Sequence, residues 1–292
     1  MFKFERIEAK DKESLGGLLN KFGLSFSDHC FGGLYIWSDT YHTEFAVEND
    51  TVIIRGKLDG KRFYQAPVGK NFECAVNFLI ENDPGNLRFL SISKEEKQRI
   101  EEAFPGKFQF VYDRDNSDYI YSREELESFQ GKKFQQKRNH INRFIRQYGM
   151  PEIVPLNTEN VAMISEAECR WLHENGPDDK WLRYENMAIK RCIEHFDMLG
   201  FIGVALKVQG EIVAFGIGER LGRGTILQHF EKATRKLDGC YTIMTREFAK
   251  ALPEDIQYIN REEDMGIEGL RKSKLSLKPI KLEDKYDGWL VK

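Results

Sequence analysis

An alternating stretch in the second half of the chain constrains the fold more than any other feature. Residues 201–233, FIGVALKVQGEIVAFGIGERLGRGTILQHFEKA, hold three runs of strand-forming residues separated by two turn sequences. A helix-like segment, CYTIMTREFAKAL, follows and is stopped by Pro253, and the strand-like run IQYINRE comes next. An antiparallel meander followed by a helix and a crossover strand predicts an α+β fold.

Both halves of the chain show this α+β order of elements. Two helix-like segments precede the meander, and a short helix and a last strand follow it, which gives the order ααβββαβαβ. The first half is a looser version with a meander at 43–69, two helices, and strand-like runs KFQFVYD and SDYIYS. Ser93 and Glu96 form a capping-box pattern. A long basic helix then stops at Gly149-Met-Pro151, so we predict two domains, 1–150 and 151–292.

Composition excludes several classes of protein. A nucleic-acid-binding protein usually has a net positive charge. This chain has a net charge of −3, so any anion site must be a local patch of positive charge. No run approaches a membrane span, and the N-terminus lacks a signal-peptide core, so no integral membrane segment is expected. Five scattered cysteines without a CxxC motif indicate a reduced, cytoplasmic protein. The six histidines have no ligand spacing, so we expect no metal.

The segment 131–148, GKKFQQKRNHINRFIRQY, carries six lysines and arginines and no acidic residue. On a helix, Lys137 and Arg138 flank the apolar stripe that begins at Phe134. One interpretation is a solvated helix face with two long side chains lying along it. The other is that these two cations border a cleft and bind a phosphate-bearing ligand.

Two further stretches suggest binding sites. In residues 26–45, aromatic and small polar residues alternate, and Asp28 among them suits a pocket for an amine-bearing substrate, although Tyr35 and Trp37 are equally suited to a core. In FEKATRKLDGCYT, a strand runs into a turn with Arg235, and Gly239 precedes a helix. Backbone amides at that helix start predict an anion site, and an ordinary loop is the alternative.

The segment 259–279, INREEDMGIEGLRKSKLSLKP, places carboxylates at the end of a strand and cations on the next turn. Alternation puts Asn260 and Glu262 on one face of that strand, where they could border a ligand crevice. Arg271 and Lys274 share one face of a short helix. A solvent-exposed loop of paired charges is the alternative interpretation.

Three stretches, GKKFQQKRNHINRF, CYTIMTREFAKAL and INREEDMGIEGLRKSKLSLKP, together resemble the phosphatidylglycerol lysyltransferase C-terminal family. The last is the most specific, with Asn-x-Glu-x-Asp-x-Gly followed by Gly-Leu-Arg and a Lys before a Pro. That family is related to peptidoglycan-bridge aminoacyltransferases. The resemblance implies two tandem GNAT-like (N-acetyltransferase-type) domains, each a mixed, mostly antiparallel sheet flanked by helices.

The resemblance also implies acyl or aminoacyl transfer, from acyl-CoA or aminoacyl-tRNA, to an amine or hydroxyl acceptor. No tightly bound cofactor is expected. The acceptor would be a small molecule or a lipid, and tRNA would be a partner if it carries the donor. The alternative is a non-catalytic module that retains the fold and binds RNA or an anionic surface through residues 131–148.

Such a reaction must align the acceptor, remove its proton and stabilise the oxyanion. We expect Glu262 or Asp264 to act as the base or as an anchor for an ammonium group, and Tyr241 to protonate the leaving group. The remaining expected residues bind substrate (Asn260, Asp28, Tyr35 and Trp37) or the donor phosphates (Lys137, Arg138, Arg235, Gly239, Arg271 and Lys274).

Overall fold

The computed structural model describes residues 2–23, 26–175, 178–222 and 224–291. The chain forms two compact units, and each unit collects segments that are distant in sequence. Unit 1 comprises Met1–Asp118, Glu263–Ile267 and Leu282–Lys292, and unit 2 comprises Tyr119–Glu262 and Glu268–Lys281. These bounds differ from the predicted domains, 1–150 and 151–292, because residues 119–150 pack within unit 2 and the last strand returns to unit 1.

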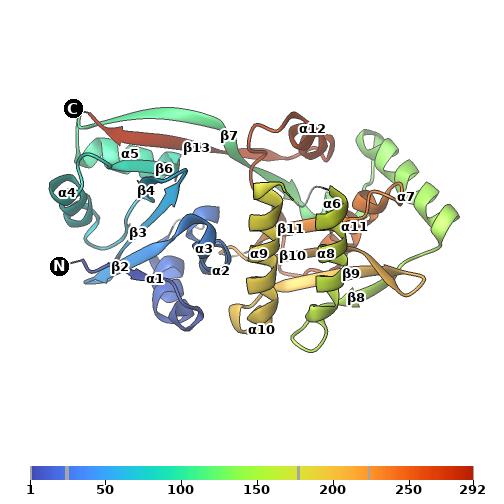
Figure 1. The fold of residues 1–292 in the computed structure, drawn as a ribbon. Helices are drawn as coiled ribbons and strands as arrows, with labels where there is room; N and C mark the ends of the chain where they lie inside the picture. Colours follow the sequence, from blue (N-terminus) through green and yellow to red (C-terminus); the bar gives the residue numbers. More distant parts are fainter. Residues whose placement is uncertain (1, 24–25, 176–177, 223, 292) are drawn as a thin grey trace. The chain divides into compact units, whose positions relative to one another are not determined.

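The sheet of unit 1 has the strand order β1-β2-β3-β4-β6-β13-β7, with β5 paired to β3 (Figure 1). Most of its strand pairs are antiparallel, and β4 with β6 is parallel. The predicted meander at 43–69 is confirmed. The strands are β1 Glu5–Arg6, β2 Glu44–Glu48, β3 Thr51–Leu58, β4 Lys61–Tyr64, β5 Val68–Gly69, β6 Arg88–Ser93, β7 Phe108–Ser122 and β13 Lys281–Leu290.

Helices of unit 1 bury an aromatic-rich core against these strands. Phe72 and Val76 of α4 pack with Phe89 of β6 and Ile100 of α5, all of them at most 2% exposed. Each such side chain contributes about 1.5–3 kcal/mol on burial. The predicted capping box of Ser93 and Glu96 is confirmed at the start of α5. The helices are α1 Ser14–Phe22, α2 Phe31–Ile36, α3 Ser38–Tyr41, α4 Phe72–Asn82 and α5 Lys94–Ala103.

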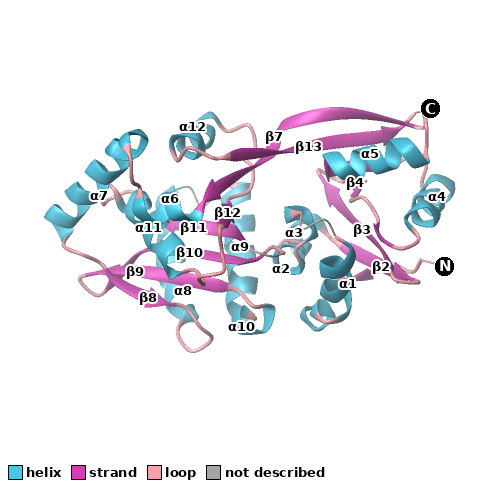
Figure 2. Ribbon diagram, turned by 180° about the vertical axis from the view of Figure 1, so that it is seen from behind, coloured by secondary structure: helices cyan, strands magenta, loops and turns pink. Residues whose placement is uncertain are grey.

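The sheet of unit 2 has the order β7-β12-β11-β10-β9-β8, so the predicted three-stranded meander is confirmed as β9, β10 and β11 (Figure 2). The strands added here are β8 Glu152–Pro155, β9 Ile202–Val208, β10 Glu211–Arg220, β11 Thr225–Ala233 and β12 Tyr258–Asn260. The helices are α6 Arg123–Ser128, α7 Gln135–Tyr148, α8 Ile164–Asn175, α9 Lys180–Glu194, α10 Phe196–Leu199, α11 Cys240–Ala251 and α12 Glu268–Ser276. No helix in the described ranges is long and apolar enough to cross a bilayer.

Strand β7 is continuous where the sequence predicts two strands, KFQFVYD and SDYIYS. The polar run between them looks like a turn. In the structure, Asp113 Oδ1 accepts hydrogen bonds from the backbone N–H groups of Asp115, at 3.0 Å, and Asn116, at 3.3 Å. These local bonds are those of a turn, yet the strand continues through them. The strand passes from unit 1 to unit 2 between Asp118 and Tyr119.

Candidate functional site

Strands β11 and β12 of unit 2 pair for three residues and then part. Their parallel ladder joins Thr225–Leu227 to Tyr258–Asn260 and ends there. Beyond the ladder, side chains connect the two segments: His229 bonds Glu262, and Glu231 pairs with Arg261. We call this region the β11–β12 parting. Polar groups at the ends of neighbouring parallel strands are suited to meet a ligand.

A β-bulge directs His229 into this region. Ile217 of β10 pairs with Phe230, and the next residue, Gly218, pairs with Gln228, so His229 is the extra residue on β11. A bulge kinks a strand and re-aims one side chain. Glycine is needed at 218 because an added Cβ would collide with the carbonyl oxygen of Leu227.

The imidazole of His229 is held between two carboxylates. Nε2 lies 2.8 Å from Glu219 Oε1, and Nδ1 lies 2.8 Å from Glu262 Oε1. The ring is buried, and burial alone would lower its pKa. The hydrogen bonds and charges of Glu219 and Glu262 outweigh that effect and raise the pKa to about 10. His229 is therefore an imidazolium at neutral pH, and it donates to both carboxylates.

Glu262 is fixed by its backbone as well as by His229. Its φ of 54° is left-handed, which is uncommon for a residue with a side chain. Its N–H donates to Asn260 Oδ1 at 2.8 Å, and its carbonyl accepts from the N–H of Tyr119 at 3.2 Å. Asn260 is fully buried, whereas the side chain of Glu262 is 28% exposed. The carboxylate is thus held on one side by an imidazolium and reachable from solvent on the other.

Positive charge exceeds negative charge around the second ion pair of the parting, because Lys137 lies near Arg261. Arg261 Nη2 lies 2.7 Å from Glu231 Oε1, and Thr245 donates to the same carboxylate. Lys137 Nζ donates to Ser276 Oγ at 2.7 Å. Burial, together with the charge of Arg261, lowers the pKa of Lys137. Lys137 and Arg261 are therefore close enough to repel each other, and an anion would relieve that repulsion.

Two of the residues expected at the site hold the local structure together. Lys274 Nζ donates to the backbone carbonyls of Arg261 and Glu262, the latter at 3.1 Å. It therefore stabilises the turn that carries the carboxylate of Glu262. Arg138 donates to the carbonyls of Phe129 and Gly131 after α6. These contacts differ from the expected phosphate-binding roles, because the donors of both cations are directed at the chain's own carbonyls.

Asp264 belongs to unit 1 and is fully buried. It lies 3.3 Å from Arg114 Nη1, and its Oδ1 accepts from the N–H of Gly266 at 3.0 Å. This is the geometry of a structural turn residue. The expected catalytic role of Asp264 stays a prediction, and these contacts do not favour it, because a carboxylate with no exposed surface cannot meet a substrate without opening the turn.

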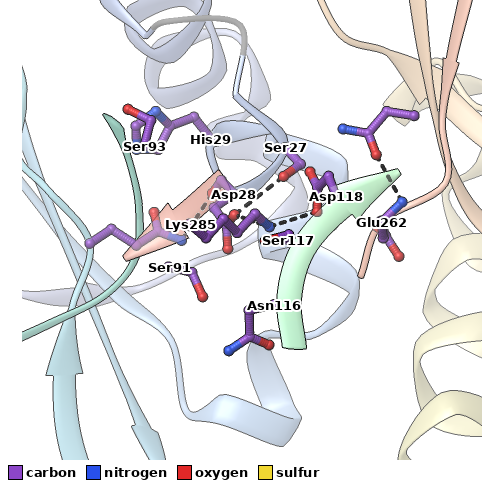
Figure 3. Close-up of polar contacts among 12 residues, drawn as sticks. Ser27, Asp28, His29, Ser91, Ser93, Asn116, Ser117, Asp118, Glu262 and Lys285 are labelled. Carbon is purple, nitrogen blue, oxygen red and sulfur yellow. Dashed lines mark hydrogen bonds and ion pairs between the residues drawn. The ribbon is translucent and has the colours of Figure 1, made fainter. Parts of the chain in front are cut away.

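Of the residues in unit 1 that were expected to bind substrate, Asp28 contacts a buried lysine and Tyr35 lies in the core. Lys285 Nζ lies 2.7 Å from Asp28 Oδ2 and 2.9 Å from Asp118 Oδ1, as Figure 3 shows. Asp28 therefore pairs with the protein's own ammonium group. Tyr35 is 6% exposed and stacks on Phe31, which fits the core interpretation given above for this aromatic residue.

The expected anion site before α11 is formed only in part. Gly239 has a φ of 86° and precedes Cys240, the first residue of α11. Arg235 is exposed in the preceding turn. Tyr241 is 45% exposed, but its hydroxyl end bonds the backbone at Ala233, and burial there raises its pKa. Trp37 and Arg271 are half-buried, and their expected roles stay predictions.

His229 was not among the residues that the sequence indicated. Its only signal is a polar pair, Gln228-His229, between the apolar residues Leu227 and Phe230. Its partners Glu219 and Glu262 lie 10 and 33 residues away along the chain. Spacing alone therefore could not reveal this arrangement.

A match to a family model shows which protein family the chain belongs to. Residues 20–287 match the model described as phosphatidylglycerol lysyltransferase, C-terminal. The chain belongs to this family. A conserved protein of unknown function from Bacteroides thetaiotaomicron is 35% identical, with 100% of both chains covered and a TM-score of 0.92. A protein of Mycoplasmoides gallisepticum is 24% identical over 175 residues, so the match spans 55% of the length of this curated relative.

More distant structures share the fold. L-PGS from Bacillus licheniformis is 17% identical, with 96% of this chain and 91% of that one covered and a TM-score of 0.65. FemX is 8% identical, with 99% and 97% covered and a TM-score of 0.60. The predicted fold class, α+β with GNAT-like units, is confirmed. The family and the fold are those of acyl- and aminoacyl-transferases.

Proposed function

We propose that the protein transfers an aminoacyl group from an activated ester to an amine or hydroxyl acceptor, and that the β11–β12 parting holds the aminoacyl end of the donor. The carboxylate of Glu262 carries this proposal. It lies at the end of β12, is partly exposed, and is held by His229 and Asn260. Family membership supports the class of reaction.

The contact with His229 supports an anchoring role for Glu262 over a role as general base. A base must take up a proton, but the imidazolium already donates one to Glu262 Oε1 at 2.8 Å. A carboxylate stabilised in this way is suited to bind a cation. The α-ammonium group of an aminoacyl ester is such a cation, whereas a simple acyl-CoA donor has none on its acyl group.

Three other side chains complete the proposed site. Arg261 and Lys137 lie beside the same strand end and are suited to an anionic part of the donor, because only Glu231 offsets their charge in the contacts described. Burial raises the pKa of Tyr241, so its hydroxyl stays protonated at neutral pH. It could pass that proton to the leaving ribose oxygen as the carbonyl–oxygen bond breaks, and regain a proton from the acceptor as the new bond to the acceptor forms.

Binding of a stable donor analogue tests the proposal. We would use 3′-aminoacylamino-adenosine, whose amide cannot be transferred, beside the same compound acetylated on its α-amino group. Wild-type protein should bind the free amine about ten- to a hundredfold more tightly, as expected for one charged hydrogen bond. In Glu262→Gln this preference should disappear. If the acetylated compound or acetyl-CoA binds wild type equally well, the ammonium-anchor proposal is wrong.

A further inference from the structure

Unit 1 contains a cavity that the proposed reaction does not use. Its volume is about 170 Å³. Its lining combines aromatic and apolar side chains with a buried histidine and charged groups. The lining residues are Phe22, Gly23, His29, Pro67, Val68, Phe72, Glu95, Glu96 and Arg99.

His29 is buried with one ring nitrogen unsatisfied. The residue is 6% exposed. Its Nε2 lies 3.3 Å from Glu96 Oε1, and the other oxygen of Glu96 accepts from the N–H of Ser93 at 2.8 Å. Nδ1 has no hydrogen-bond partner among the residues that the structure describes. A buried polar atom left in this state destabilises the protein, so a ligand that satisfied it would gain affinity.

Cations flank the aromatic walls of the cavity. The guanidinium of Arg99 lies 4.0 Å from the centre of the Phe72 ring, and its one described hydrogen bond, to Gly69 O, is long at 3.4 Å. Burial lowers the pKa of Arg99. Lys21 Nζ lies 4.9 Å from the centre of the Phe22 ring. Arg99 is the cation of the lining that can bind an anion, and Lys21 adds a positive charge beside Phe22 outside the lining.

Glu96 is the second acidic residue of the lining, and its charge raises the pKa of Arg99 against the effect of burial. Both of its oxygens are already bonded, one to His29 and one to the backbone of Ser93. The remaining walls, Pro67, Val68 and Phe72, are buried and apolar. A dry protein cavity of about 150 Å³ is known to hold benzene, so this space suits an apolar body of about five to nine non-hydrogen atoms.

We propose that this cavity binds a small carboxylic acid with a branched or aromatic body and one hydroxyl or amino substituent. The carboxylate accepts hydrogen bonds from Arg99. The apolar body packs between Phe22, Phe72 and Val68. The substituent donates to Nδ1 of His29, which the contact with Glu96 leaves as the acceptor. Hydroxy acids and amino acids share this chemistry. The inference is independent of the transfer reaction, because it uses none of the residues of the β11–β12 parting.

Three acids with one carbon skeleton test the proposal by calorimetry and thermal shift. These are 2-hydroxy-4-methylpentanoate, leucine and unsubstituted 4-methylpentanoate, with 4-methylpentylamine as the cationic control. At least one substituted acid should bind about tenfold more tightly than the unsubstituted acid, as a satisfied buried nitrogen requires. The amine should not bind. Which of the first two binds better distinguishes a hydroxy-acid ligand from an amino-acid ligand.

Variants then locate the site. Arg99→Gln should weaken binding at least tenfold, whereas Lys94→Gln, on the same helix but outside the lining, should leave it unchanged. Val68→Phe should fill the cavity and abolish binding without requiring any change to His29. The proposal is overturned if no acid binds at about 10 mM, if the amine binds as well as the acids, or if Val68→Phe binds normally.

Discussion

His229 and Glu262 lie 2.8 Å apart, and they join two strands at a point where the strands no longer pair through their backbones. The histidine comes from a bulge in β11, and the glutamate comes from a left-handed residue after β12. Two local departures from regular strand geometry therefore create one ion pair. Such departures cost about 1–3 kcal/mol and are often found at functional sites.

Removal of the charge of Glu262 should affect the reaction more than the fold. In Glu262→Gln, transfer from aminoacyl-tRNA should fall about ten- to a hundredfold, because one charged contact to the donor is lost. Glu254→Gln, an exposed glutamate before β12, is the matched control and should keep full activity. Labelled amino acid passed to acceptor measures the rate. Equal rates in the two variants would exclude Glu262 from the site.

The stability of the protein should fall with rising pH because of His229. Its pKa is 6.5 when unfolded and about 10 in the folded protein, so the folded state binds the proton more tightly. The resulting stabilisation is complete below about pH 6.5 and is lost progressively as the pH rises towards 10. Urea unfolding at about pH 6 and about pH 9 should show a decrease of a few kcal/mol.

The variant His229→Gln provides the control for that titration. It cannot take up the proton, so its free energy of unfolding should change much less between the two pH values. All other titrating groups remain, and the difference between the two proteins isolates His229. An equally steep loss in the variant would mean that another group causes the pH dependence.

Loss of the buried ammonium group of Lys285 should destabilise the protein strongly. Its side chain is 4% exposed, and Asp118 is fully buried beside it. Lys285→Met keeps most of the volume but leaves the carboxylates without their cation, which typically costs about 3–5 kcal/mol. Lys190→Met, at an exposed position on α9, should cost little. The double variant Lys285→Met with Asp118→Asn should recover part of the loss in urea unfolding.

Gly239 should tolerate no side chain. Its φ is 86°, and an added Cβ would lie 2.7 Å from the carbonyl oxygen of His140 in α7. Gly239→Ala should therefore lower the free energy of unfolding by about 1–3 kcal/mol. Gly17, in α1, has open space around an added Cβ, and Gly17→Ala should instead stabilise by about 0.5–1 kcal/mol. Opposite signs in urea unfolding would confirm both.

Local patterns in the sequence predict most of the elements. Alternation predicts β9, β10 and β11, and the Ser93–Glu96 pattern predicts the start of α5. The polar run at Asp113–Asn116 is misleading, because it resembles a turn inside one strand. The division of the chain is not predictable in this way, because the pairing of β13 with β6 joins residues almost 200 positions apart.

The site is predicted less completely than the fold. The sequence indicates Glu262 and Asn260 because polar residues at the end of a strand form a local pattern. Asp264, two residues later, has the same pattern but is buried as a turn residue. Polarity in a sequence does not indicate whether a carboxylate faces a cation of the protein or a ligand. Both carboxylates pair with a cation of the protein, Arg114 for Asp264 and His229 for Glu262, and only the 28% exposure of the Glu262 side chain leaves one of them open to a ligand.

The position of β13 has a consequence for synthesis on the ribosome. This strand lies between β6 and β7 in the sheet of unit 1, yet it is made after β12, well after both of its neighbours. Until it leaves the exit tunnel, β6 and β7 each present an open edge, and Asp28 and Asp118 lack their shared cation. At translation rates of about 5–20 residues per second, the wait lasts about ten to thirty seconds. During this time the nascent chain is most exposed to wrong strand pairing and most in need of chaperones.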